Sequence, residues 1–563
     1  MNISGLLYSR IGYDLGDPMR VLIRSTIKDY IPHGSRFEVI DCKTGKPVIE
    51  DEIKQWGEKW KSFWWEANFS RLDRAGIYKI LVYDKAEVSS RNIISSSDSF
   101  KVGENVLWNE TVKTVAVEQM EARAKLARNG NGWKDCGADW REVNSHATMI
   151  IGLCDLLNMH YEKLLVDEVT RIAGQIIHGC DYIALCQDKA EQVGYPEGAI
   201  IHEIPNHMII IPGDIAQSVV ALAKASRLLT EINGEKSSEY LGRAVKAYEY
   251  LLHKAEPFGP EGFSHMNHGV PDDFRIPKEW MTRDLLMMLW GGIELWASGK
   301  MAYKEEALRI ARQVMSRQIP EDKKEGEFFG HFRTFDSCCF SEKANTHHHV
   351  GHDTGATFPH YLIPFFEMLR RWYDHPDVIH WRKCLNDFAY GYFLPACSQN
   401  PFYLLPEGYF AGQGLLVFCG PWHGINTSIA FGAALAAKFE AFTGDKRFRN
   451  IAVGNLQWIA GLNAGLTQES FKGCLKWKDE IPDGVAIPYS QIFGIGSRYV
   501  GCWSGIKGSI VNGFAVNPQF QLIVEPTAEN DGPWLFTDED WIPHTGGWLS
   551  ALSYLRNLKF CNF

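Results

Sequence analysis

The sequence predicts a multidomain β plus α protein: a small β-sandwich at residues 1–103, followed by a large (α/α)6 helical toroid at residues 104–563. Short alternating apolar runs, broken by Gly, Pro and Asp, fill the first segment and are typical of strands and turns. From Glu110 onward apolar residues recur at three- and four-residue spacing, which is the period of amphipathic helices. No fixed-period repeat accompanies the helices, which favours a closed ring over an open solenoid.

Strands of the first domain are expected within Arg20–Ile27, Phe37–Ile40 and Ile77–Val82, and the run SSSDSFKVGENVLW reads as a last strand and linker. Twelve helices are expected in the second domain. Their ranges are Thr111–Arg128, Asn144–Leu157, Leu164–Leu185, Asp214–Leu229, Glu239–Lys254, Thr282–Ala297, Lys304–Arg317, Pro359–Tyr373, Val378–Tyr392, Asn426–Thr443, Lys446–Leu462 and His544–Leu558. Unusually long loops separate several of them and are expected to build a cleft on one face.

Charge and composition narrow the function. With 58 Lys plus Arg against 68 Asp plus Glu, the net charge is −10, and no basic block is present, so nucleic acid is not an expected partner. The longest uncharged stretch, Gly408–Ala437, contains Pro421 and several glycines and is interpreted as buried helix plus loop rather than a membrane span.

Location follows from the termini and the cysteines. The N-terminus lacks a secretory signal, and the 13 cysteines form no CxxC pair. We therefore expect a cytoplasmic protein, or a secreted or periplasmic one if a signal peptide has been removed. The sequence does not predict the oligomeric state.

Aromatic residues make up 13% of the chain, and many Trp residues lie in the expected loops. Flat ring faces beside carboxylates suit sugar rings, although core packing is the commoner role of any single Trp. The candidates for contact with a carbohydrate substrate are Trp140, Trp422 and Trp541.

A glycine-rich loop, NGNGWKDCGADWREVNSHA at 129–147, places Asp135 and Asp139 just before an apolar helix. Two carboxylates held close together can orient a water and deprotonate it, which is the general-base half of inverting glycoside hydrolysis. The alternative is that Asp139 or Asn144 simply caps the helix.

This loop resembles the GGWYDAGDYGKY region of glycoside hydrolase family nine, the inverting cellulases. In the same order along the chain, SRIGYDLGDPMRVLIRS is similar to the NQVGYLPNGPKRAVV opening of that family's immunoglobulin-like domain, and FEAFTGDKRFRNIAVGNLQWIAGLNAGLTQESFKG resembles TGDxxYxxxAxxQLdYiLGxNPxxxSFVxG. The ending FTDEDWIPHTGGWLSALSYL resembles NExxxxxNAxxxxAL. The resemblance implies an immunoglobulin-like domain before the toroid and an inverting hydrolase of O-glycosidic bonds in β-linked sugars.

The same resemblance assigns roles. It implies that Glu539 protonates the leaving oxygen while Asp135 and Asp139 hold the nucleophilic water. Because Asp538, Asp540 and Trp541 flank Glu539, we expect its pKa to be raised. No cofactor is required, and a structural calcium or zinc ion is left open.

Three features depart from the family pattern. DCGAD is one residue longer than DAGD, so Asp139 matches the base position only with a shift. The family's His-His-Arg substrate motif is missing, and only Arg498 remains to contact substrate. The segment 343–361 has no counterpart in the family; it contains His347, His348, His349 and His352. Their spacing matches no standard zinc motif, so sugar contact by His352, a metal or a structural loop all stay open.

Other polar residues lie near loop-to-helix junctions, where ordinary hydrogen bonding is the expected role of each one alone. These are His202, Glu203, His207, His265, His268, Asp272, Asp273, His423, Asn426 and His544. His423 is the best candidate among them for substrate contact. Two alternatives to hydrolysis remain open: a polysaccharide lyase or sugar epimerase that uses His and Tyr on the same toroid, and an inactive carbohydrate-binding relative.

Overall fold

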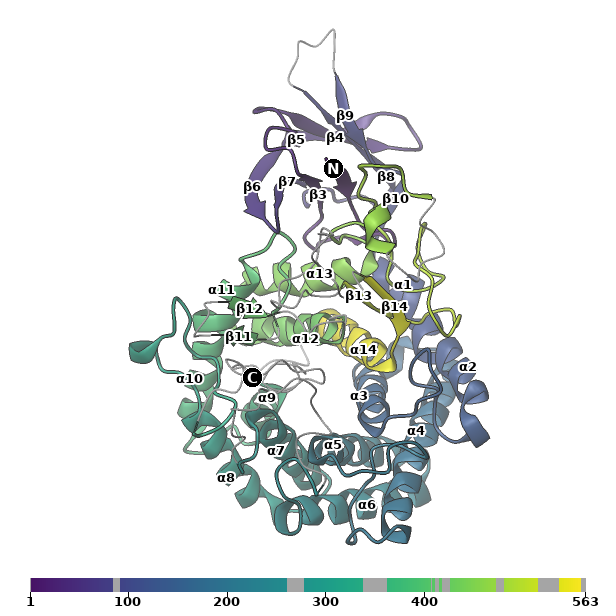
Figure 1. Cartoon of the computed structure of the whole chain (residues 1–563), viewed down its shortest axis with the longest axis vertical. Coiled ribbons are helices and arrows are strands. Elements are labelled where there is room, and N and C mark those ends of the chain that lie inside the picture. The colour runs from purple at the N-terminus through teal and green to yellow at the C-terminus, as the bar shows by residue number, and fades with distance from the viewer. Residues whose placement is uncertain are drawn as a thin grey trace.

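The computed structural model describes residues 2–84, 92–260, 278–337, 362–406, 408–410, 415–417, 426–471, 480–514 and 536–557. A β-rich N-terminal part sits on a ring of helices (Figure 1). The last strand of the first part, β10 (Phe100–Gly103), ends shortly before the first helix, α1 (Val106–Lys113), begins.

Two sheets form the N-terminal part. One has the order β1 (Ser4–Leu7), β3 (Arg20–Ser25), β7 (Ser62–Asn68) and β6 (Lys54–Lys59). The other has the order β2 (Tyr13–Asp14), β10, β8 (Gly76–Tyr83), β4 (Arg36–Asp41) and β5 (Pro47–Glu52), with β9 (Ile93–Ser96) also paired to β8. Alternate residues such as Val21, Ile23, Val39, Ile80 and Val82 meet in one buried core. The predicted β-sandwich is confirmed.

Six helices line the inside of the ring. They are α3 (Val143–His160), α5 (Pro212–Leu229), α7 (Thr282–Ala297), α9 (Ile363–Arg371), α12 (Asn426–Thr443) and α14 (Ile542–Arg556). The outer layer consists of α4 (Val166–Gln192), α6 (Gly234–His253), α8 (Tyr303–Ser316), α10 (Val378–Phe388), α13 (Arg447–Ala460) and the continuous run of α1, a π-helical turn (Thr114–Glu118) and α2 (Gln119–Leu126). Among the described residues this gives six helical pairs.

The ring closes on itself. Helix α14 packs against both α3 and α12, and the contacts continue from α3 to α5, α7 and α9. Between α9 and α12, the rings of Phe366 and Phe439 lie 5.2 Å apart, edge to face. The predicted (α/α)6 toroid is therefore confirmed, and Figure 1 shows it nearly end on.

Shorter elements complete the described chain. They are the helix α11 (Leu394–Cys397), the π-helical turn Ala389–Phe393, the 3-10 turns Arg128–Gly130, Tyr161–Lys163, Glu321–Lys323 and Gln468–Phe471, and the paired strands β11 (Gly408–Phe410) with β12 (Leu415–Val417) and β13 (Val511–Phe514) with β14 (Phe536–Asp540).

The first helix differs from its sequence prediction. A helix was expected only from Thr111, but α1 starts five residues earlier, within the predicted linker. The reason is tertiary: the carboxylate of Asp14, on β2, accepts hydrogen bonds from the backbone N–H groups of Val106 and Leu107. An acceptor supplied from a distant strand satisfies the free N–H groups of the first turn.

The sandwich is fastened to the toroid by charge and by packing. The guanidinium of Arg556, at the end of α14, binds the carboxylates of Asp14 and Asp17, and Arg449 on α13 also binds Asp17. Leu22 and Trp64 of the sandwich belong to the same buried core as the toroid helices. The two parts therefore share an apolar interface rather than a flexible hinge.

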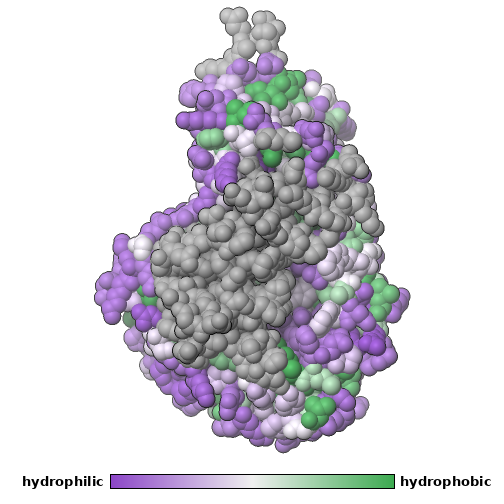
Figure 2. Space-filling model, viewed as in Figure 1, coloured by the Kyte–Doolittle hydropathy of each residue, from purple (hydrophilic) through white to green (hydrophobic). Residues whose placement is uncertain are grey.

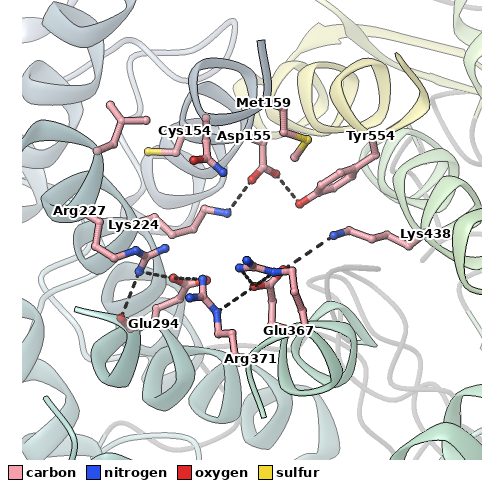
Figure 3. A pocket seen from close by; sticks show the side chains of 13 residues that line it. Cys154, Asp155, Met159, Lys224, Arg227, Glu294, Glu367, Arg371, Lys438 and Tyr554 are labelled. Carbon is pink, nitrogen blue, oxygen red and sulfur yellow. Dashed lines mark hydrogen bonds and ion pairs between the residues drawn. The ribbon is translucent and has the colours of Figure 1, made fainter. Parts of the chain in front are cut away.

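A ring of charged side chains fills the toroid at the C-terminal ends of the inner helices (Figure 3). Lys224 on α5 binds Asp155 on α3 at 2.6 Å, and Glu367 on α9 binds Arg370 and Arg371 of its own helix. These groups surround a cavity of about 110 Å³. The described surface seen in Figure 2 is mainly hydrophilic, with small scattered hydrophobic areas. None of the described helices is long and apolar enough to span a bilayer.

Candidate active site

The opposite end of the toroid, at the N-termini of α3, α5, α12 and α14, brings together most of the unusual polar groups. Strand β14 runs directly into α14 and pairs antiparallel with β13. Because side chains alternate across a strand, Asp538 and Asp540 face one way and Glu539 faces the other. This alternation gives three consecutive carboxylates two different surroundings.

Asp540 is a structural anchor. Its carboxylate and the guanidinium of Arg123, on α2, form an ion pair in which both side chains are fully buried. The backbone N–H and the hydroxyl of Ser504 also donate to Asp540, at 2.9 and 2.7 Å. A buried charge that is paired and hydrogen-bonded on several sides holds its strand firmly. Asp540 therefore fixes the position of its neighbour Glu539.

Glu539 receives a chain of hydrogen bonds from two inner helices. The side-chain N–H of Asn512 donates to its Oε2 at 3.1 Å. The amide oxygen of Asn512 lies 2.6 Å from Nε2 of His544, whose Nδ1 contacts the hydroxyl of Thr427. Burial lowers the pKa of His544 to about 3, so the ring is neutral. Because an amide oxygen only accepts, Nε2 carries the proton and Thr427 donates to Nδ1.

The surroundings of Glu539 raise its pKa to about 7. Burial is the main cause, and the negative charges of Asp540 and Glu142 add to it, while the hydrogen bond from Asn512 acts against them. A carboxyl group that keeps its proton near neutral pH can act as a general acid. The raised value agrees with the expectation from its acidic neighbours.

Asp135 is fully buried beneath the glycine-rich loop. Its Oδ2 accepts the backbone N–H of Glu142 at 2.6 Å, and its own carbonyl accepts the N–H of Ile542 at the start of α14 at 2.9 Å. Its Oδ1 is buried without a hydrogen-bond partner in the described part of the chain. Burial, with the nearby charge of Glu142, raises the pKa of Asp135 to about 8.

The loop that carries Asp135 is held from two sides. Arg141 donates to the carbonyls of Arg128, Asn131 and Ile204, which pins the loop to the segment after α4. On the other side, a Cβ added to Gly137 would lie 2.0 Å from Cβ of Trp503. Only glycine allows the loop to pass this close to Trp503.

Glu142 is the second carboxylate at this end of the loop. It immediately precedes α3, and its side chain is 18% exposed. The hydroxyl of Ser145 donates to its Oε2 at 3.2 Å, and Nε2 of His202 lies 3.6 Å from its Oε1. The other ring nitrogen of His202 is 2.6 Å from Asp214, on α5. Burial opposes a charge on His202, but the two carboxylates outweigh it and raise the pKa of this imidazole well above its usual value.

Solved structures with the same architecture are family 9 glycoside hydrolases. A metagenome-derived family 9 endoglucanase aligns over 98% of this chain and 99% of its own, with a TM-score of 0.64 and 13% identity. The Bacteroides ovatus family 9 enzyme aligns over 98% of each chain, with a TM-score of 0.62 and 13% identity. AaCel9A, in complex with cellobiose-like isofagomine, aligns over 99% of this chain and 100% of its own, with a TM-score of 0.62 and 13% identity.

The chain has the fold of family 9 glycoside hydrolases. The resemblance predicted from sequence motifs is thus confirmed for the fold. No family model and no curated protein sequence matches the chain.

On this family 9 fold the predicted site residues are distributed unevenly. Glu539 and Asp135 come together at the start of α14, where Trp541 pairs with Cys136 and its ring lies 5.7 Å from that of His544. Trp140 is half-buried beside the ring of His207, at 4.7 Å. Both tryptophans are close in sequence to the carboxyl groups: Trp541 is two residues after Glu539, and Trp140 lies between Asp135 and Glu142.

Asp139 and Arg498 are the other predicted site residues that the structure describes. Asp139 is exposed on the loop between Asp135 and Glu142. Arg498 lies over the ring of Tyr489, 5.4 Å from its centre, next to Ser497, whose N–H donates to the carbonyl of Arg10 in the sandwich. Trp422, His423 and His352 lie outside the described residues, as does the whole histidine-rich segment 343–361.

A metal site is not apparent in the part of the chain that the structure describes, because it holds no group of three or more His, Cys, Asp or Glu side chains suited to an ion.

Sequence reasoning missed Glu142 and gave no particular role to His202. The only local signal was a carboxylate two residues before an expected helix, where an acidic side chain is usually interpreted as a favourable partner of the helix dipole. Glu142 pairs with His202, 60 positions away, and His202 pairs in turn with Asp214, which a single sequence does not reveal.

Proposed function

We propose that this protein is an inverting glycoside hydrolase that cleaves O-glycosidic bonds in β-linked oligo- or polysaccharides. The observation that carries the proposal is Glu539 at the start of α14: its pKa is raised to about 7, and the loop 135–142 beside it carries three more carboxyl groups, those of Asp135, Asp139 and Glu142. A carboxyl group whose surroundings keep it protonated near neutral pH is the usual general acid of such a site.

In the proposed reaction Glu539 donates its proton to the glycosidic oxygen as the bond to the anomeric carbon breaks. A carboxylate of the loop 135–142 removes a proton from a water that attacks the anomeric carbon from the opposite face. One proton is given and one is taken, and the product has the inverted configuration. Inverting enzymes leave about 6.5–9.5 Å between the two carboxyl groups to admit the water.

The nature of the substrate is proposed from two sources. Trp140 lies in the glycine-rich loop and Trp541 directly follows Asp540, and both are half-buried, so their rings are candidates for contact with sugar rings. Two of the solved structures with this fold are described as a family 9 endoglucanase and as a complex with cellobiose-like isofagomine. We therefore propose β-linked gluco-oligosaccharides as the first substrates to test.

Neither His544 nor His202 supports histidine-based lyase or epimerase chemistry. His544 uses both ring nitrogens in fixed hydrogen bonds, and His202 is held as an imidazolium between two carboxylates. Neither ring is free to take a proton from a substrate carbon.

The test compares wild type with Glu539→Gln on β-linked gluco-oligosaccharides, and on the same sugars with a dinitrophenol leaving group. Loss of the general acid is expected to slow cleavage of the natural bond by about 10²–10⁴-fold. Cleavage of the dinitrophenyl glycoside should be slowed much less, because that leaving group needs no proton. Proton NMR of the first product should show the inverted anomer.

Three results would contradict the proposal. Equal activity of Glu539→Gln on both substrates would remove Glu539 from the acid role. A retained anomer would exclude the inverting mechanism. Ultraviolet absorbance from an unsaturated sugar, with no new reducing ends, would indicate a lyase.

A further inference from the structure

We propose that Glu142, and not Asp139, is the general base of this site, with Asp135 and the His202–Asp214 pair as its positioning residues. The inference rests on the proposed function, because a general base requires a hydrolytic reaction. It departs from the pattern of paired aspartates that the glycine-rich loop suggests. Four features of the described residues support it: the solvent access of Glu142, its effect on the pKa of Glu539, its charge state and the contacts that hold it in place.

Access to water distinguishes Glu142 from Asp135. A general base must touch the water that it deprotonates. Asp135 is fully buried: its Oδ1 is closed off from solvent, and its Oδ2 is occupied by the backbone N–H of Glu142 at 2.6 Å. Glu142, by contrast, keeps 18% of its side chain exposed. Asp135 is therefore placed to hold the backbone of Glu142 rather than a water molecule.

Proximity to the acid separates Glu142 from Asp139. The two charges that do most to raise the pKa of Glu539 belong to Asp540 and Glu142. Asp540 is committed to its buried ion pair with Arg123. Glu142 is thus a carboxylate that raises the pKa of Glu539 and is still partly open to solvent, whereas Asp139 is not among the main charges that raise this pKa.

The state of charge also favours Glu142. The raised pKa of Asp135, about 8, keeps this carboxyl group protonated at neutral pH, and a protonated group cannot accept a proton from water. Glu142 lies 3.6 Å from the imidazolium of His202, and an adjacent positive charge favours the ionised form of a carboxyl group. Asp214 in turn holds the other nitrogen of that ring at 2.6 Å.

Several contacts fix the position of Glu142. The N–H of Val143 donates to the carbonyl of His202 at 2.9 Å, which ties the start of α3 to the histidine segment. Ser145 donates its hydroxyl to Glu142 at 3.2 Å. Glu142 also stands at the N-terminus of α3, an 18-residue helix whose dipole favours an anion there.

The experiment compares Glu142→Gln, Glu142→Ala and Asp139→Asn with wild type on dinitrophenyl β-cellobioside, a substrate that needs no acid. Loss of the base should slow the two Glu142 variants by about 10²–10⁴-fold. Asp139→Asn, which removes a carboxylate from the same loop, should lose less than about tenfold. Thermal melting curves of each variant check that the fold is retained.

A chemical rescue distinguishes a base from a structural residue. In Glu142→Ala, azide can enter the space of the lost carboxylate and attack the anomeric carbon, so that a C–N bond forms as the C–O bond to dinitrophenolate breaks. Added sodium azide should restore turnover at least tenfold and yield a glycosyl azide of inverted configuration, identified by NMR. Azide should not raise the rate of Asp139→Asn.

The positioning role of Asp135 has its own readout. Since Asp135 is neutral below pH 8 in this proposal, Asp135→Asn preserves its shape and its acceptor for Glu142. The variant should keep a measurable rate below pH 7, with no azide product. If Asp135 were the base, the same substitution would abolish turnover and azide would restore it.

The outcomes separate this inference from the proposed function. A wild type that cleaves none of the β-linked glycosides rejects the proposed function and, with it, the inference. If wild type is active, a loss below tenfold in Glu142→Gln overturns the inference alone. Azide rescue at position 139 or 135 instead of 142 would do the same.

Discussion

Glu539 and Asp135 show how the residue type leaves a role undecided until the environment is known. Both are acidic side chains with raised pKa values, about 7 and about 8. Glu539 is half-buried, so part of its side chain remains open to solvent. Asp135 is fully buried, and its carboxylate accepts a hydrogen bond from the backbone N–H of Glu142. Solvent access, rather than acidity alone, separates the two.

The raised pKa of Glu539 makes a prediction about stability. Between pH 4.5 and about 7 the unfolded chain loses this proton while the folded chain keeps it, so the stabilising contribution present below pH 4.5 is lost as the pH rises. The loss amounts to at most about 3 kcal/mol. Glu539→Gln carries no such proton and should be more stable than wild type at pH 8, with the difference vanishing near pH 4.5. Denaturation midpoints at both pH values measure it, and a difference that does not change with pH would contradict it.

The sequence identified Glu539 because its neighbours carry a family-like pattern over 20 residues, from Phe536 to Leu555. It gave His202 only as one of ten polar residues near helix starts. Its contacts to Glu142 and Asp214 depend on how the segment after α4 folds back on the glycine-rich loop, through the pairing of Ile201 with Ile210. Such contacts depend on the tertiary structure, so the local spacing of residues in the sequence does not predict them.

At the scale of elements, the spacing of apolar residues predicted the bounds of a helix correctly where the helix is buried along its whole length. Helices α7 and α12 have the predicted bounds, Thr282–Ala297 and Asn426–Thr443. It failed where another part of the chain sets the boundary, as Asp14 does for α1. Helix α13 ends at Ala460, two residues before its predicted end, because Gly461 has a positive φ of 125° that breaks the helix.

The close approach of the glycine-rich loop to Trp503 gives a prediction at this scale. Gly137→Ala puts a Cβ 2.0 Å from that of Trp503, so the loop must move away from the segment that donates to Asp538 and Asp540. We expect a destabilisation of about 1–3 kcal/mol, the range for overpacking, and a fall in activity of at least tenfold. Thermal melting and initial rates measure both.

Gly174→Ala is the matched control. Gly174 lies within α4, and nothing stands within 4 Å of a Cβ added there. Alanine is a better helix former than glycine, so this variant should be neutral or slightly more stable. Equal effects at the two glycines would show that the contact with Trp503 is unimportant.

At the scale of the whole molecule, the two ends of the toroid have different tasks. The N-terminal ends of the inner helices hold the candidate catalytic groups, whereas the C-terminal ends hold the charged ring of Figure 3. Five cationic and three anionic side chains line that cavity, an excess of two positive charges. Helix C-termini carry partial negative charge, so the ends of six inner helices offset this excess.

Removing one anion from the ring should therefore destabilise the fold without touching the chemistry. Glu367→Gln leaves Arg370, Arg371 and Lys438 without their shared partner, and breaking a buried ion pair costs about 3–5 kcal/mol. Denaturant unfolding should show this loss, while the rate per folded molecule stays the same. The control is Glu306→Gln, which breaks an exposed pair with Arg309 and should cost no more than about 1 kcal/mol. A large change in rate with an unchanged midpoint would mean that the ring serves catalysis.

The ion pair between Arg123 and Asp540 spans 417 positions of sequence, and the strand that carries Asp540 leads into the helix that fills the gap between α3 and α12. Before that last segment docks, the ring of inner helices would be open between α3 and α12. The apolar faces of these two helices would then be exposed, and Glu539 would not be in position. Bringing together partners so distant is slow compared with forming local helices. If the proposed function holds, activity therefore requires that this last segment has docked. A chain that is already helical but still open would be inactive and prone to aggregate along its two exposed apolar edges.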